Sequence, residues 1–279
     1  MTQEDLHRIQ EIGKEILFMV DDICRKYQID YFLIYGTLLG CVRHKGIIPW
    51  DDDVDVAMTR DNFLRFVDVC KHEINSADYS VMLMDNGHGK YLTELKIGKK
   101  GTTYCMAGAE NLGIMNHVHL DVFVLESPKI LTEKQMIRRM KIWSYIKIIT
   151  LNKSEKDLLR ILIGRSSKKG KWFYKRILDI FDVVCGIIGA INIEKIGFKM
   201  LVDTTMKSDS FLIIGAPYNV VFKKAWFGRI EKEYSGRLLS VPSQYDEVLK
   251  TVYGDYMKLP PEDKRYPKNF KDWIFKENK

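Results

Sequence analysis

The stretch from Tyr35 to Val56, YGTLLGCVRHKGIIPWDDDVDV, concentrates the features that decide the fold. It starts at the end of an apolar run, YFLIY, passes a Gly36-Thr37 pair, and ends with four aspartates within five positions, at 51, 52, 53 and 55. Apolar residues follow the aspartates, which predicts that this negative charge lies at the start of a buried strand. Carboxylates crowded in such a place repel one another unless a cation lies between them.

Three of the aspartates are predicted to form a metal site. Asp53 and Asp55 are two residues apart, and because side chains alternate along a strand, we expect both to point to one face, with Asp52 pointing away. Asp121, within HLDVFVL, offers a third carboxylate from a second strand. Carboxylates from adjacent strands can hold Mg²⁺, or Mn²⁺, and leave coordination positions for phosphate oxygens and water. A solvated acidic turn is the alternative, but the alternating apolar residues argue against it.

Periodicity along the chain predicts an α/β protein. Helices are expected over residues 3–28, 38–42 and 245–253, in a basic segment over 132–200, and after Thr59, which we expect to cap its helix. Strands are expected at 31–35, 54–58, 80–83, 91–97 and 117–125. We divide the 279 residues into a catalytic core over 1–130, a basic helical insertion over 131–205, and a C-terminal closing segment over 206–279 that packs on the core.

Composition narrows the class of protein. The five cysteines are scattered without a C-x-x-C pair, and the polar start of the chain does not resemble a signal peptide, so we expect a cytoplasmic location. Residues 133–176 contain fourteen Lys or Arg against three Asp or Glu, a local charge of +11 in a chain of net charge +7. This asymmetry predicts either an anionic partner or a helical subdomain with a basic exterior. We expect no nucleic-acid partner, because the basic stretch contains no recognisable DNA- or RNA-binding motif.

The order strand, Gly-Thr, helix, D-x-D strand and a later acidic strand resembles the nucleotidyltransferase superfamily typified by DNA polymerase β. The longer stretch from Tyr35 to Val56 resembles the signature of the LicD family, the phosphorylcholine transferases of bacterial surface glycans. Fukutin-related ribitol-phosphate transferases are more distant relatives of that family. The resemblance extends to HLDVFVL, VPSQYDEVLKTVYGDYM and LPPEDKR, and so covers most of the chain outside the basic insertion.

This resemblance implies a Mg²⁺-dependent transferase with a nucleotidyltransferase-like mixed sheet. Its donor would be a CDP-alcohol, with CDP-choline favoured, and a hydroxyl of a lipid-linked glycan would attack the distal phosphorus and release CMP. The glycan would be a precursor of teichoic acid, lipopolysaccharide or capsule. Asp53, Asp55 and Asp121 would be the catalytic residues as well as the metal ligands, and Asp121 would either bind metal or accept the proton of the acceptor hydroxyl.

The donor phosphates are expected to contact backbone and basic groups from two segments. These candidates are Gly36, Thr37, Arg43, Lys45, Lys264 and Arg265. Supporting positions around the metal site are Asp51, Trp50, His44 and His119, with Trp50 either packing the loop or stacking on cytosine.

Two alternatives stay open at this stage. A glycerol- or ribitol-phosphate transferase of the same family would share the site. A true nucleotidyltransferase would share the carboxylates but transfer NMP to a sugar phosphate or other small acceptor and release pyrophosphate. The basic insertion, with its interleaved aromatic residues, predicts a peripheral contact with the inner face of the cell membrane.

Overall fold

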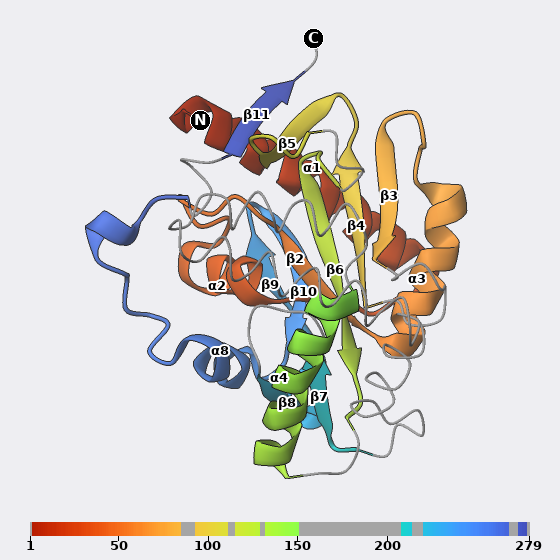
Figure 1. Ribbon diagram of the computed structural model, residues 1–279, viewed down its shortest axis with the longest axis vertical. Coiled ribbons are helices and arrows are strands. Elements are labelled where there is room, and N and C mark those ends of the chain that lie inside the picture. Colours follow the sequence, from red (N-terminus) through yellow and green to blue (C-terminus); the bar gives the residue numbers. More distant parts are fainter. Residues whose placement is uncertain are drawn as a thin grey trace.

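Figure 1 shows the computed structural model of the chain, which describes residues 2–84, 93–110, 115–128, 132–150, 208–213, 220–267 and 273–277. Within these residues the protein is a mixed α/β structure built around a seven-stranded sheet. Its main path runs in the order β1 (Phe32–Leu33), β2 (Asp55–Thr59), β6 (His119–Glu126), β4 (Glu94–Lys99) and β3 (Tyr79–Met84). Two further strands, β7 (Ser210–Ile213) and β8 (Val221–Lys223), extend the sheet from the C-terminal end of β6.

The centre of the sheet is the parallel pair β2 and β6, and the other pairings are antiparallel. Almost every residue of these two strands is buried, apart from partly buried positions at their ends and at Asp121. Parallel strands covered on both faces are typically rich in apolar residues, as the runs VAM and VFVL are. An aspartate on each of these strands is therefore exceptional and needs a reason beyond folding.

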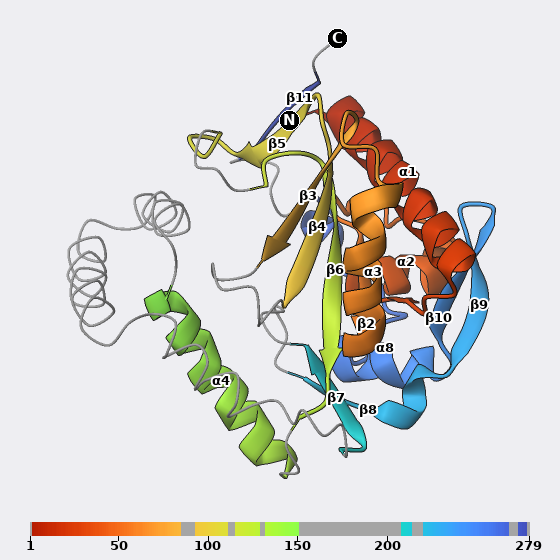
Figure 2. The ribbon, with the colours of Figure 1, turned by 90° about the vertical axis from the view of Figure 1, so that its right-hand side faces the viewer.

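Two helices, α1 (Gln3–Tyr27) and α3 (Arg60–Glu73), cover one face of the sheet, as Figure 2 shows. The N-terminus of α1 is fixed by a capping box, in which the backbone N–H of Asp5 donates to the Thr2 hydroxyl and the Asp5 carboxylate accepts from the Thr2 N–H. The helix turns a buried apolar stripe toward the sheet at steps of three, four and seven: Leu6, Ile9, Ile16, Val20 and Ile23. The prediction of a helix over 3–28 is confirmed.

The shorter helices α2 (Tyr35–His44) and α8 (Tyr245–Tyr253) lie beside a hairpin formed by β9 (Arg229–Tyr234) and β10 (Arg237–Pro242). The hairpin turn is Ser235-Gly236, and both residues have positive φ, at 51° and 82°. Two-residue hairpin turns favour this backbone because its twist matches that of the strands. A 3₁₀ turn, η1 (Lys224–Phe227), precedes the hairpin.

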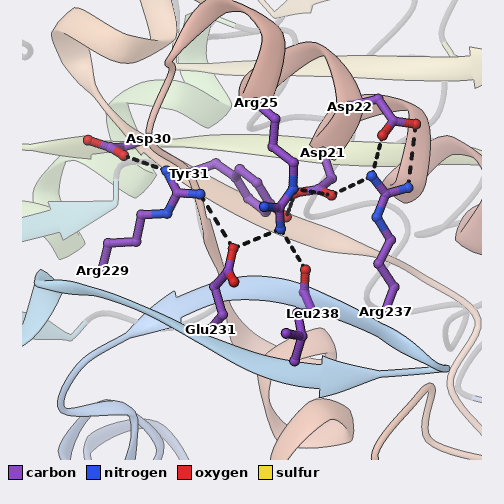
Figure 3. Close-up of polar contacts among 9 residues, drawn as sticks. All are labelled: Asp21, Asp22, Arg25, Asp30, Tyr31, Arg229, Glu231, Arg237 and Leu238. Carbon is purple, nitrogen blue, oxygen red and sulfur yellow. Dashed lines mark hydrogen bonds and ion pairs between the residues drawn. The ribbon is translucent and has the colours of Figure 1, made fainter.

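A network of charged side chains joins this hairpin to α1, and Figure 3 shows it in close-up. Its centre is Asp21, a fully buried carboxylate that accepts hydrogen bonds from Arg25 and from the hydroxyl of Tyr31, the latter at 2.8 Å. Arg237 of β10 also lies 2.7 Å from Asp21, and Arg25 reaches the backbone oxygen of Leu238. Segments about 215 positions apart in the sequence are thus held together by one buried charge.

The C-terminal end of the described chain returns to its beginning. Strand β11 (Trp273–Glu277) pairs antiparallel with β5 (Thr102–Met106), and Glu277 accepts two hydrogen bonds from Arg8 of α1 at 2.7 and 2.8 Å. Figure 1 accordingly shows the N-terminus and β11 close together. This small sheet brings Trp273 next to residues of the central sheet, which matters for the site described below.

Several boundaries differ from those predicted. The strand expected at 31–35 is only Phe32–Leu33, because the chain already enters α2 at Tyr35, whose φ is 47°. The helix expected at 38–42 is correspondingly longer. Strand β2 begins at Asp55 rather than Val54, and Thr59 occupies the N-cap position of α3 without making a side-chain capping bond. Its hydroxyl accepts a hydrogen bond from the Asn62 side chain instead.

The basic segment is described only at its start, as helix α4 (Glu133–Thr150). The rest of the predicted insertion lies outside the described residues, so the proposed domain boundaries stay predictions. In the part of the chain that the structure describes, no helix is long and apolar enough to cross a membrane. The four cysteines of that part, Cys24, Cys41, Cys70 and Cys105, are buried free thiols.

Candidate active site

A cleft of about 480 Å³ opens at the N-terminal ends of the parallel strands β2 and β6, where Asp55 and Asp121 lie. Four segments line it: the start of α2, the loop before β2, the beginning of β6, and the chain after α8. Its carboxylates are Asp51, Asp53, Asp55, Asp121 and Asp255. Its basic residues are Arg43, Lys258 and Lys264.

The pairing of β2 with β6 positions two of the predicted metal ligands. Asp55 and Asp121 are direct partners in the register of this parallel pair, so their side chains leave the same face of the sheet. Asp53 precedes β2, yet it lines the same cleft as the other two. Their assignment as catalytic residues stays a prediction, but the structure brings all three together.

The Gly36-Thr37 pair contacts the segment that carries the aspartates. The buried Thr37 hydroxyl accepts a hydrogen bond of 2.8 Å from the backbone N–H of Asp55, which ties the start of α2 to the start of β2. Gly36 lies against Asp51, and a Cβ atom at this position would collide with the Asp51 carboxylate. Gly36 lines the cleft, whereas Thr37 does not, so the structure gives Thr37 a contact with the strand rather than with the cleft.

A buried glutamine of α1 holds the loop that carries the aspartates. The side-chain amide of Gln10 donates to the backbone oxygens of Ile48, Pro49 and Asp51 at 3.3, 3.4 and 2.8 Å. These carbonyls belong to the turn that presents the acidic run. Sequence reasoning missed Gln10, because nothing local to its helix indicates a contact about 40 positions away.

The cleft concentrates negative charge around Asp55. Burial raises the pKa of the Asp55 carboxyl well above its usual range, and the nearby carboxylates of Asp53, Asp121 and Asp51 raise it further. Among the described residues, the acidic group whose ligand oxygens all lie within 4.8 Å of one another is Asp51, Asp52 and Asp53, which shares only Asp53 with the predicted ligand set. Carboxylate oxygens are the ligands that a hard divalent cation such as Mg²⁺ prefers, so the aspartates that line the cleft suit such an ion.

Asp121 differs from the others because a lysine faces it. Lys96 of β4 lies opposite Asp121 in the sheet and donates to it at 2.7 Å, and it pairs with Glu94 at the same distance. Burial lowers the pKa of the Lys96 ammonium, but these two carboxylates outweigh burial and raise it above its usual value. The Nδ1 atom of His119 lies 2.7 Å from the backbone oxygen of His117. A carbonyl oxygen can only accept a hydrogen bond, so Nδ1 is the donor of this pair. The other ring nitrogen, Nε2, lies 3.5 Å from the Asp121 carboxylate.

The predicted phosphate contacts are placed in two groups. Arg43 and Lys264 line the cleft, and Arg43 donates to the backbone oxygen of Tyr256 at 2.8 Å. Lys45 is exposed and does not line the cleft, and Arg265 lies over the Trp50 ring at 5.9 Å and donates to the Pro260 oxygen. The assignment of these residues to phosphate binding stays a prediction.

The supporting positions lie around the loop. Trp50 lines the cleft, and its ring meets that of His44 edge-on at 5.9 Å, so His44 packs against Trp50. Burial and the neighbouring Arg43 lower the pKa of His44, which favours its neutral form. Asp52 does not line the cleft, and its carboxylate accepts a 2.5 Å hydrogen bond from the Tyr104 hydroxyl.

Comparison with known proteins shows which family the chain resembles. A family model described as "LicD/FKTN/FKRP, nucleotidyltransferase domain" matches residues 28–154, which include all four aspartates of the acidic run and Asp121. The lipopolysaccharide cholinephosphotransferase LicD of Haemophilus influenzae is 30% identical to the chain over 98% of both proteins. The chain belongs to the LicD family. Uncharacterized proteins of Rickettsia typhi and Rickettsia prowazekii match shorter parts, at 44% identity over 16% of the chain and 34% over 22%, and these parts make up 15% and 26% of the relatives.

This LicD-family chain also has an aromatic wall that sequence reasoning did not assemble. Six aromatic residues line the cleft: Tyr35, Trp50, Phe123, Tyr253, Tyr256 and Tyr266. Tyr253 is the last residue of α8, and Tyr256 and Tyr266 follow that helix, as do Asp255 and Lys258. Residues 253–257 form the YGDYM segment, which belongs to a stretch that resembles the family. The family resemblance pointed to this segment, and the fold shows that it lines the same cleft as the aspartates.

Proposed function

We propose that the protein transfers phosphocholine from CDP-choline to a sugar hydroxyl of a bacterial surface glycan and releases CMP, on a nucleotidyltransferase-like fold. In this reaction a bond forms between the acceptor oxygen and the phosphorus that bears choline. The bond from that phosphorus to the bridging oxygen breaks, CMP leaves with its electron pair, and the acceptor hydroxyl gives up its proton to a carboxylate of the cleft, from which it passes to solvent. The observation that supports the proposal is the convergence of five carboxylates, three of them the proposed metal ligands, and six aromatic residues on one cleft, in a chain that aligns with LicD over 98% of both proteins.

The aromatic wall supports choline over other alcohols. A quaternary ammonium is held by the faces of aromatic rings, through attraction to their negative π surface. The end of α8 and the chain after it contribute three tyrosines to the cleft, and the exposed Asp255 carboxylate belongs to the same segment. Glycerol and ribitol carry no positive charge, so they gain nothing from this lining.

The carboxylates would hold Mg²⁺, with Asp53, Asp55 and Asp121 as the proposed ligands and Asp51 beside them. When bound, the cation would supply charge neutralisation at the pyrophosphate and at the leaving CMP. Arg43, Lys258 and Lys264 would contact phosphate oxygens from the other walls of the cleft. Alignment and charge neutralisation are the main demands of phosphoryl transfer, and this set of residues can meet them.

The choice of alcohol can be tested with a panel of donors. Wild-type protein with Mg²⁺ and a bacterial lipid extract should release CMP faster from CDP-choline than from CDP-ethanolamine, CDP-glycerol or CDP-ribitol. Tyr253→Leu removes an aromatic face and should raise KM for CDP-choline about fivefold or more. Tyr245→Leu, in the same helix but outside the cleft, is the matched control. Faster release from CDP-glycerol or CDP-ribitol would reject the choline assignment.

The acceptor carrier is proposed to lie at an anionic membrane surface, contacted by the basic segment over 133–176. Its charge of +11 predicts that association with vesicles containing phosphatidylglycerol falls steeply as salt is raised. Sedimentation with such vesicles at low and high salt measures this. Association that is unchanged between the two salt concentrations would assign the segment to a structural role.

A further inference from the structure

A second, smaller cavity adjoins the cleft. It measures about 220 Å³, and Asp53 and Asp121 line both it and the larger cleft. A group bound in the small cavity would therefore meet a group bound in the cleft at two of the proposed catalytic carboxylates. In a transfer between two substrates, the donor and the acceptor must meet at such a boundary.

Two of the residues that line this cavity but not the cleft form an aromatic pair. Trp273 and Tyr104 have ring centroids 4.8 Å apart, at a tilt of 47°. The β11–β5 register explains their contact: Trp273 pairs with Met106, and Tyr104 lies two residues along the partner strand, on the same face. The Tyr104 hydroxyl is fixed by its bond to Asp52, so the pair presents a positioned aromatic surface. Sequence reasoning assigned no role to either residue.

The polar groups of the cavity disfavour an anion. Its lining includes three carboxylates, from Asp52, Asp53 and Asp121. Among the described residues that line it, Lys96 is the only lysine or arginine, and it already pairs with Glu94 and Asp121. Asp53 and Asp121 would share the proposed Mg²⁺ with the donor in the cleft. The wall beyond them offers an anion, among its described residues, no lysine or arginine but the already paired Lys96, whereas hydroxyl groups could donate to the Asp52 carboxylate.

We propose that this cavity, which we call the Trp273 pocket, is the acceptor subsite and binds one uncharged, hydroxyl-rich ring such as a sugar. Its volume is below the range of about 300–1,000 Å³ usual for ligand pockets, which fits one ring rather than several. The ring stacks on Trp273, and one of its hydroxyls points past Asp53 and Asp121 toward the donor. This inference rests on the proposed transfer reaction and adds to it a neutral acceptor, where a sugar phosphate is the acceptor of a nucleotidyltransferase.

The test compares Trp273→Leu with Phe275→Leu, a substitution two residues along the same strand that lies outside both cavities. With lipid extract as acceptor, Trp273→Leu should raise the half-saturating extract concentration about tenfold, without changing the Kd for CDP-choline measured by calorimetry. Trp273→Phe keeps an aromatic face and should retain most of the wild-type affinity. Phe275→Leu should match wild type in both measurements.

A second readout needs no turnover. Saturation-transfer NMR with methyl glucoside, methyl galactoside and methyl N-acetylglucosaminide should detect binding of at least one glycoside to wild type and to Phe275→Leu, and none to Trp273→Leu. Glucose 6-phosphate should bind more weakly than methyl glucoside. If wild type releases no CMP, the proposed reaction fails, while the NMR comparison still decides the pocket. Unchanged acceptor dependence in an active, folded Trp273→Leu protein, or tighter binding of glucose 6-phosphate, would overturn the inference.

Discussion

Asp55→Asn should lower CMP release from CDP-choline by about a hundredfold or more while the protein stays folded. Asp55 is the most buried of the proposed metal ligands that line the cleft, and it faces Asp121 across the parallel strands. Asparagine keeps the size and shape of the side chain but removes a negative charge from the proposed metal site. Cation binding and neutralisation of the leaving group would then weaken together.

The same substitution should not destabilise the metal-free protein at neutral pH. The pKa of Asp55 is raised in the folded state, so the folded protein loses stability as pH increases through that raised pKa and the carboxyl ionises in its buried site. Asparagine stays neutral and avoids this cost. We therefore expect the Tm of metal-free Asp55→Asn at pH 7 to equal or exceed that of wild type, and the stabilisation by Mg²⁺ to be smaller.

A matched control is Asp68→Asn, which changes an exposed aspartate of α3 far from both cavities in the fold. It should leave CMP release unchanged. Excess EDTA should reduce wild-type release as strongly as Asp55→Asn does. An active Asp55→Asn protein, or full turnover in EDTA, would remove the proposed metal site from the mechanism.

Asp21→Ala should lower the free energy of unfolding by about 1–3 kcal/mol, the usual cost of removing the acceptor of a buried hydrogen-bond donor, here the Tyr31 hydroxyl. Asp21 is fully buried and is contacted by Arg25, Arg237 and the Tyr31 hydroxyl, as Figure 3 shows. Its removal also takes the shared anion from Arg25 and Arg237, which keep Glu231 and Asp22 as carboxylate partners at the interface between α1 and the β9–β10 hairpin. Urea unfolding, followed by circular dichroism, measures the loss.

The neighbouring Asp22 provides the control for this prediction. Its side chain is 67% exposed, and it pairs with Arg237 at the surface. Exposed pairs typically contribute about 0–1 kcal/mol, so Asp22→Ala should have little effect. Equal destabilisation by the two substitutions would show that burial of Asp21 is not what makes the network stabilising.

The proposed catalytic carboxylates could be predicted because their pattern is local. Asp53 and Asp55 are close in sequence, and Asp121 lies in an apolar run whose alternating pattern predicts a strand. The register that brings Asp55 opposite Asp121 follows from the parallel pairing of two buried strands. The positive φ of Tyr35 and the early start of α2 could not be predicted, because they depend on how the start of α2 packs against the segment that carries the aspartates.

The residues that sequence reasoning missed are those placed by long-range contacts. Lys96 looks like an ordinary strand residue until β4 pairs with β6 and sets it opposite Asp121. Trp273 reaches the site only because β11 returns to β5 from the far end of the chain. The Ser235-Gly236 turn was a local signal for the β9–β10 hairpin, and that hairpin could have been predicted.

The most direct test of the proposed reaction is to determine which half of the donor moves. Wild-type protein, Mg²⁺, CDP-choline and a bacterial lipid extract would be followed by ³¹P NMR, with a parallel reaction in which CTP replaces CDP-choline. We expect CMP and a choline phosphodiester of the extract to appear in equal amounts, and the CTP reaction to yield no pyrophosphate. Pyrophosphate released from CTP together with a nucleotide-modified acceptor, or free phosphocholine and CMP without any phosphodiester, would contradict the proposed reaction.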